Sequence, residues 1–161
     1  MKKFKYIIPI LLVFSLLLTG CYIKIPNSIL EKKKPSISHY TDEMLSSFKK
    51  EDPIEVNVLY LNFYKGQRLN EGEVLTLRKF FKYLKKDNFT EKPKDLPEAP
   101  EYKLFITFNH EKYVLDVYNN NYLSLYPWDG DYEKDYITMK DTYTSYNIFN
   151  LCEYVISNNK K

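Results

Sequence analysis

Three aspartates have the best potential for acid–base chemistry in this chain. Asp116 falls within a run of strand-forming residues, and Asp129 and Asp131 follow in a loop. Glycoside hydrolysis needs two carboxyl groups on opposite sides of one bond. A small cell-envelope hydrolase that pairs Asp116 with Asp129 or Asp131 is therefore one hypothesis. The sequence does not show which carboxylates face each other, so we assign no catalytic residue.

Metal, cofactor and nucleotide chemistry find little support in the sequence. His39 and His110 lie too far apart to form a recognisable zinc motif. Residues 128–135 carry acids at alternate positions, but the glycine and glutamate of an EF-hand loop are missing from the required places. The four glycines form no phosphate-binding loop and no dinucleotide fingerprint. We predict no metal ion, no cofactor and no nucleotide.

Cys152 has the chemistry of a nucleophile, but its position favours a structural role. It lies within a helical pattern near the C-terminus, where apolar residues recur at intervals of three and four: Ile148, Leu151, Cys152 and Val155. This spacing places the thiol on the buried face of the predicted helix. Because free cysteine is among the most frequently buried residue types, we expect it to pack in the core.

Aromatic residues on one face of a predicted strand are the most suggestive feature. Along residues 122–126 the leucines alternate with Tyr122, Ser124 and Tyr126, so the two sets face opposite sides of a sheet. A face of tyrosine, tryptophan and aspartate can stack on a sugar or grip a protein. Tyrosine also suits half-exposed strands through β-propensity alone, so a purely structural role stays open. The predicted contact residues are Tyr118, Tyr122, Tyr126, Trp128, Asp116, Asp129 and Asp131.

The first 20 residues have the parts of an export signal. Three lysines and no acid occupy the first five positions, and an apolar stretch runs from Tyr6 to Leu18. This stretch is typical of a signal peptide and is shorter than the roughly 20 apolar residues of a transmembrane helix. We expect residues 1–20 to be removed.

Leu18-Thr19-Gly20-Cys21 closes this segment and resembles the lipobox of bacterial lipoproteins. The resemblance implies a lipid on Cys21 and a location on the extracytoplasmic face of the cell membrane. Lipid burial contributes about 0.8 kcal/mol per methylene, and two chains anchor a protein stably. In size and residue usage the chain also resembles small lipoproteins of low-GC Gram-positive bacteria, whose activities are unknown.

The rest of the chain divides into a tether and one domain. Residues 21–52 are rich in proline and lysine, which indicates a lipidated N-terminus and tether, with a short helix near residues 41–50. Residues 53–161 are long enough for a single domain with a core of its own. An internal repeat is not visible.

The domain is predicted to be α+β. A helix starts at Asn70, where Glu73 completes a capping box, and a second begins at Thr144 or Ser145. Turn residues separate the strand-like runs, which indicates an antiparallel sheet of about four to five strands with both helices on one face. The runs cover residues 54–63, 104–108, 113–118, 122–126 and 136–139, in the order β-α-β-β-β-β-α.

Charge argues against nucleic-acid binding. Without the three leader lysines, 21 basic residues remain against 21 acidic ones. Nucleic-acid-binding domains usually carry a basic excess on one face.

The sequence therefore favours a membrane-anchored, non-catalytic module of the cell envelope that binds a ligand or a protein. A glycan or an envelope protein is the expected partner, besides the membrane itself. The hydrolase described above is one alternative. A structural or accessory subunit of an envelope complex, with its aromatics buried against another protein, is the other.

Overall fold

The computed structural model describes residues 33–158, which form part of one compact unit that begins at Lys33. The predicted leader, the lipobox and Cys21 lie outside the described residues. Within the described part of the chain, no helix is both long and apolar enough to cross a membrane.

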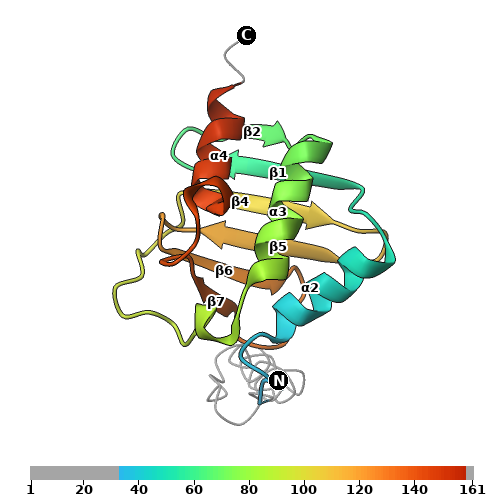
Figure 1. The fold of residues 1–161 in the computed structure, drawn as a ribbon, viewed down its shortest axis with the longest axis vertical. Helices are drawn as coiled ribbons and strands as arrows, with labels where there is room; N and C mark the ends of the chain where they lie inside the picture. Colours follow the sequence, from blue (N-terminus) through green and yellow to red (C-terminus); the bar gives the residue numbers. More distant parts are fainter. Residues whose placement is uncertain (1–32, 159–161) are drawn as a thin grey trace, which may run out of the picture. The chain divides into compact units, whose positions relative to one another are not determined.

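An antiparallel sheet forms the centre of the fold (Figure 1). Its seven strands in the described residues are β1 Glu55–Tyr60, β2 Lys65–Arg68, β3 Phe89–Thr90, β4 Tyr102–Thr107, β5 Lys112–Val117, β6 Tyr122–Pro127 and β7 Asp135–Thr138. They lie in the order β2-β1-β4-β5-β6-β7-β3. The α+β class and the antiparallel sheet are confirmed.

The predicted number of strands was wrong, because β2 and β3 were missed. β2 contains Gly66 and polar residues and forms the edge of the sheet beside β1. β3 has only two residues and pairs with β7 at the other edge. Edge strands with little apolar character carry almost no hydrophobic periodicity, so sequence patterns detect them poorly.

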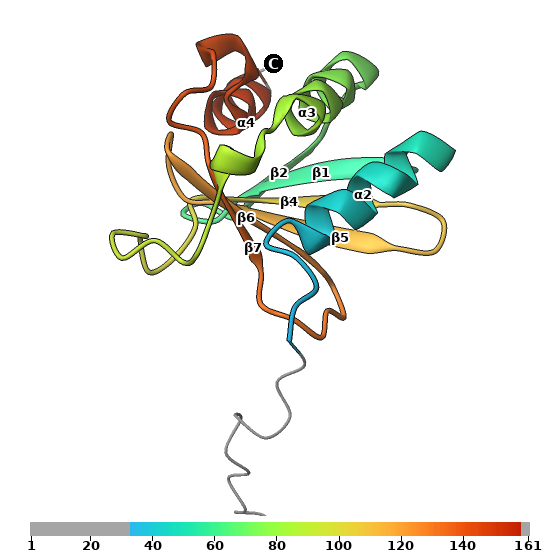
Figure 2. The ribbon, with the colours of Figure 1, turned by 60° about the horizontal axis from the view of Figure 1, so that its bottom comes forward.

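Three helices cover one face of the sheet in the described part of the chain (Figure 2). They are α2 His39–Lys50, α3 Glu71–Tyr83 and α4 Ile148–Ser157. No helix of the described residues lies on the opposite face (Figure 2). We call it the open face of the sheet.

The start of α3 confirms the predicted capping box. The side chain of Asn70 accepts a hydrogen bond from the Glu73 amide at 3.0 Å, and the Glu73 carboxylate accepts one from the Asn70 amide at 2.7 Å. The last helix begins later than predicted. Residues Thr144–Tyr146 form a 3-10 turn, and Asn147 caps α4 by accepting a hydrogen bond from the Phe149 amide.

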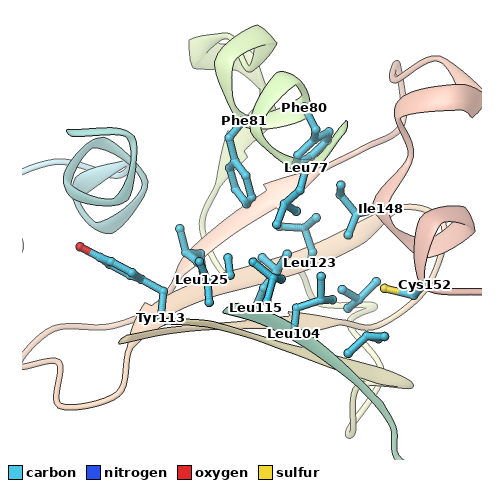
Figure 3. Close-up of a cluster of buried hydrophobic side chains, with 14 of the residues drawn as sticks. Leu77, Phe80, Phe81, Leu104, Tyr113, Leu115, Leu123, Leu125, Ile148 and Cys152 are labelled. Atoms are coloured by element: carbon cyan, nitrogen blue, oxygen red, sulfur yellow. The ribbon is translucent and has the colours of Figure 1, made fainter. Parts of the chain in front are cut away.

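The core lies between the helices and the inner face of the sheet. Leucines from the central strands point toward Leu77, Phe80 and Phe81 of α3 (Figure 3). Cys152 of α4 is 1% exposed and reduced, and burial raises the pKa of its thiol. The prediction that Cys152 packs in the core is confirmed.

α2 belongs to the compact unit, although the sequence placed the start of the domain at residue 53. Met44 and Phe48 of α2 are buried in the core, and Tyr40 is 2% exposed. An amphipathic helix of this length is marginal by itself, so its packing on the sheet stabilises it. The helix near residues 41–50 thus forms as part of the fold.

Candidate functional site

The strongest candidate site is a cleft beside α2 with a volume of about 630 Å³. Its walls are the second half of α2, the turn between β4 and β5, and the start of the loop after β6. Ligand pockets commonly occupy about 300–1,000 Å³. We call it the Trp128 cleft. It is lined by four residues of α2, by residues 108–113 and by residues 127–129; the four from α2 are Glu43, Ser46, Ser47 and Lys50.

Trp128 stands on the rim of this cleft with 71% of its surface exposed. Its indole ring is therefore available to a ligand, while its backbone amide is fixed by a 2.9 Å hydrogen bond to the Lys112 carbonyl. The exposed Asp129 lies next to it in the same lining. A large exposed ring on a rigid backbone is a favourable contact for a ligand because little side-chain entropy is lost on binding.

Part of the cleft lining is a polar group of hydrogen-bonded side chains. Glu111 accepts hydrogen bonds from the Ser47 hydroxyl at 2.6 Å and the Tyr113 hydroxyl at 2.8 Å. The hydrogen bond from Ser47 is the main reason why the pKa of Glu111 is lowered, and the bond from Tyr113 adds to it against the opposing effect of burial. Glu111 is therefore ionised at neutral pH and acts as an acceptor rather than as an acid.

The loop that carries Trp128 is fastened to α2 by Tyr40. The Tyr132 amide donates a hydrogen bond to the Tyr40 hydroxyl at 2.6 Å, and the hydroxyl donates to the Tyr132 carbonyl at 3.3 Å. A Cβ atom on Gly130 would lie 2.7 Å from the Tyr40 hydroxyl oxygen and 2.9 Å from Cγ of Pro127. Only glycine fits there, so the close approach of loop and helix depends on it.

A second polar cluster lies on the open face of the sheet. Asp116 is 1% exposed and forms ion pairs with Lys103 and Lys134, the latter at 2.7 Å. Burial alone would lower the pKa of each lysine, but the hydrogen bond and the charge of Asp116 outweigh burial and raise it. Both amines therefore stay protonated, and Asp116 is paired with two cations.

Tyrosines surround this cluster. The Lys134 amine lies 4.1 Å from the centroid of the Tyr126 ring, which is a cation–π contact. Tyr118 is 8% exposed, so little of its ring is available to a partner. Tyr122 lies at the far end of β6, where its hydroxyl donates a hydrogen bond to Asp95 at 3.2 Å.

The predicted contact residues are thus divided between two places. Asp116 and Tyr126 meet on the open face through Lys103 and Lys134, whereas Trp128 and Asp129 line the Trp128 cleft on the helix side. Asp131 is exposed in the loop after β6. Asp116 is not among the residues that line the Trp128 cleft, so the structure does not place it with Asp129 in that cleft.

Sequence reasoning missed the two lysines and the contribution of α2. Lys103 lies directly opposite Asp116 in the β4–β5 register, in which Thr107 pairs with Lys112. Placing the turn at residues 108–111 would have predicted this pair. The α2 wall had no comparable signal, because the contact between α2 and the β4–β5 turn joins residues about 60 positions apart.

Among the described residues, no group of three or more histidine, cysteine, aspartate or glutamate side chains is arranged to hold a metal ion. The residues of the Trp128 cleft offer hydrogen-bond acceptors and an aromatic ring instead.

Comparison with known proteins places the chain in a family. Residues 34–152 match the model of a domain of unknown function, DUF4883. The chain belongs to the DUF4883 family. The matched region starts before α2 and ends within α4, so α2 and the walls of the Trp128 cleft are parts of the DUF4883 domain.

A solved structure shares this fold. It is the crystal structure of a putative lipoprotein from Clostridium perfringens, with 35% sequence identity and a TM-score of 0.69. The similarity covers 77% of this chain and 98% of that chain. No protein with a curated description matches this one significantly. The DUF4883 match and the neighbour described as a putative lipoprotein are both consistent with an extracytoplasmic lipoprotein. Neither of them indicates a specific function.

Proposed function

We propose that this DUF4883 protein is a lipid-anchored binding module on the extracytoplasmic face of the cell membrane, and that its Trp128 cleft takes a sugar-containing ligand of the cell envelope. The observation that carries the proposal is the position of Trp128. It is 71% exposed, and it stands at the rim of a polar cleft of about 630 Å³.

The chemistry of the cleft suits a sugar. A pyranose ring has an apolar face of C–H groups that stacks on an indole ring, and its edge of hydroxyl groups needs polar partners. Glu43, Asn109 and Asp129 line the cleft and provide carboxylate and amide groups for such hydroxyls. Polar groups placed in this way around a pocket give a site its specificity.

Two observations support the anchoring part of the proposal. The segment Leu18-Thr19-Gly20-Cys21 resembles a lipobox, and the structural neighbour from Clostridium perfringens is described as a putative lipoprotein. A binding module on a membrane anchor would hold its ligand, a wall polymer or a fragment of one, close to the cell surface.

Trp128 provides its own probe for testing the proposal, because it is the only tryptophan in the chain. We expect peptidoglycan fragments to change the intrinsic tryptophan fluorescence of residues 22–161 in a saturable way. No saturable change with any envelope glycan would contradict the proposed ligand class and would favour a protein partner.

Variants locate the binding. Trp128→Ala keeps the backbone hydrogen bond to Lys112 and removes the ring, so calorimetry should show an affinity at least about tenfold weaker, as expected for a central aromatic contact. Tyr143→Ala is the matched control, since Tyr143 is 81% exposed and lies outside the cleft. Equal affinities for the two variants would place the ligand elsewhere.

A further inference from the structure

The turn between β1 and β2, residues 61–64, presents two aromatic side chains to solvent. Phe63 is 76% exposed and Tyr64 is 84% exposed. The Phe63 ring lies 5.4 Å from the ring of Tyr60 at the end of β1, so it rests against the base of the turn. We call these two residues the aromatic tip.

The backbone conformation at Tyr64 is unusual for an aromatic residue. Tyr64 has a φ of 49°, and no other non-glycine residue in the described part of the chain has a positive φ. This left-handed conformation is easy for glycine and tolerable for asparagine, but it is unfavourable for an aromatic residue. Because the Tyr64 ring is almost fully exposed, it contributes little packing that would offset the cost. The fold therefore does not account for tyrosine at this position.

We propose that the aromatic tip inserts into the interfacial layer of a lipid bilayer and gives the protein a second contact with the membrane. The proposal rests on the lipid anchor of the proposed function, but it does not depend on the ligand of the Trp128 cleft. A weak contact is sufficient here, since an anchored protein already has a high effective concentration at the surface.

The shape and chemistry of the tip suit a bilayer. Two aromatic rings at the end of a hairpin protrude from the protein surface. A bilayer can take up protruding side chains without a preformed pocket. Tyrosine is enriched at membrane interfaces because its ring is apolar and its hydroxyl is polar, and phenylalanine reaches deeper.

A basic residue, Lys65, lies next to the tip along the chain. The Lys65 amine, next to Tyr64, donates a 2.8 Å hydrogen bond to the Ile156 carbonyl near the end of α4. A basic residue close to an anionic membrane surface favours binding, so we expect a preference for anionic lipids.

The covalent chain is long enough for both contacts. Lys34 pairs with Asp135 of β7 at 2.5 Å, and β2 lies five strand positions from β7. At about 4.8 Å per strand the sheet separates them by about 24 Å. The 13 residue steps from Cys21 to Lys34 span at most about 43–47 Å. A lipid on Cys21 and the aromatic tip can therefore reach one bilayer.

Vesicle flotation tests the inference with unlipidated protein. Residues 22–161 contain the whole described core, from Met44 to Ile156, so they are expected to fold without the leader. We expect this protein to float with phosphatidylglycerol vesicles. The double variant Phe63→Ser, Tyr64→Asn should lose most of that binding, whereas Tyr143→Ser should keep it, as Tyr143 is equally exposed but far from the tip in sequence. Absence of binding by the parent protein, or equal binding by all three, would overturn the inference.

Tyr64→Asn alone separates membrane contact from folding. Asparagine tolerates the left-handed backbone, so its thermal midpoint should equal or exceed that of the parent while vesicle binding falls several-fold. A purely structural role for Tyr64 predicts the reverse, a lower midpoint with unchanged binding. Neither readout involves a glycan, so failure here leaves the test of the Trp128 cleft intact.

Discussion

Asp116 shows at the scale of a single residue how burial decides what a carboxylate can do. In the sequence it is a strand aspartate, a residue type that can serve as an acid, a base or a ligand contact. In the structure its two oxygens are occupied by Lys103 and Lys134, and its surface is 1% exposed. A buried carboxylate held by two protonated amines is suited to joining β4, β5 and the segment before β7.

Asp116→Asn is expected to lower the free energy of unfolding by about 2–3 kcal/mol. Breaking a buried ion pair typically costs about 3–5 kcal/mol, and the loss is smaller here because the lysine side chains are 26% and 35% exposed. Urea denaturation measures the change. Asp129→Asn, at an exposed position, is the control and should stay within about 0.5 kcal/mol of the parent. Equal stabilities for the two variants would show that the cluster is not a stabilising one.

At the scale of the elements, α2 depends on a residue from β7. Ser38 precedes the helix but provides no side-chain cap. Instead the buried Asp135 carboxylate accepts hydrogen bonds from the Thr41 amide at 2.7 Å and the Thr41 hydroxyl at 2.8 Å. It also pairs with Lys34 at 2.5 Å. A carboxylate at a helix N-terminus is favoured by both the free amides and the helix dipole.

Asp135→Ala should therefore loosen α2 and open one wall of the Trp128 cleft. We expect a loss of about 3 kcal/mol, since a helix cap and a buried ion pair disappear together. Hydrogen exchange should accelerate in α2 more than in α3. Asn70→Ala, which removes the cap of α3, is the matched control. It should lower the free energy of unfolding by about 1 kcal/mol and accelerate hydrogen exchange in α3 more than in α2. If Asp135→Ala accelerated hydrogen exchange equally in α2 and α3, Asp135 would not have a local role at α2.

At the scale of the whole molecule, the start of the described chain and the aromatic tip lie at opposite edges of one sheet. The chain enters beside β7, where Lys34 contacts Asp135, and the aromatic tip adjoins β2 at the opposite edge. In Figure 1 the start of α2 and the end of α4 lie at opposite ends of the described unit. The Trp128 cleft, the open face and the aromatic tip can therefore engage different partners.

Cys21→Ala should release the protein from the membrane fraction. The expected anchor is lipid on the Cys21 sulfur, and the mature chain has no other proposed attachment of comparable strength, because two acyl chains bury far more apolar surface than an aromatic tip. Cell fractionation with metabolic lipid labelling measures both effects. Cys152→Ala is the control, since its buried thiol is not a lipidation site. Unchanged retention and labelling of Cys21→Ala would refute the anchor.

Local features were predicted well and non-local ones poorly. The capping box at Asn70 and Glu73 was predicted because its two residues are three positions apart and their hydrogen bonds close within one turn. β2 and β3 were missed because their pairing partners, and not their own patterns, make them strands. Trp128 and Asp129, which line the Trp128 cleft, were among the contact residues proposed from the sequence. The α2 wall of the cleft and the two lysines that pair with Asp116 became apparent only from the packing of the fold.

The sequence by itself determined the α+β class and the burial of Cys152, and it predicted an export segment that stays a prediction, since each depends on composition or on periodicity along the chain. Only the tertiary structure decided that Asp116 is paired with two lysines, that Trp128 stands over a cleft and that Tyr64 is held in an unfavourable conformation. The physical reason is the range of the interactions involved. Periodicity reports which face of an element is apolar, but the register of strands and the docking of helices determine which side chains meet.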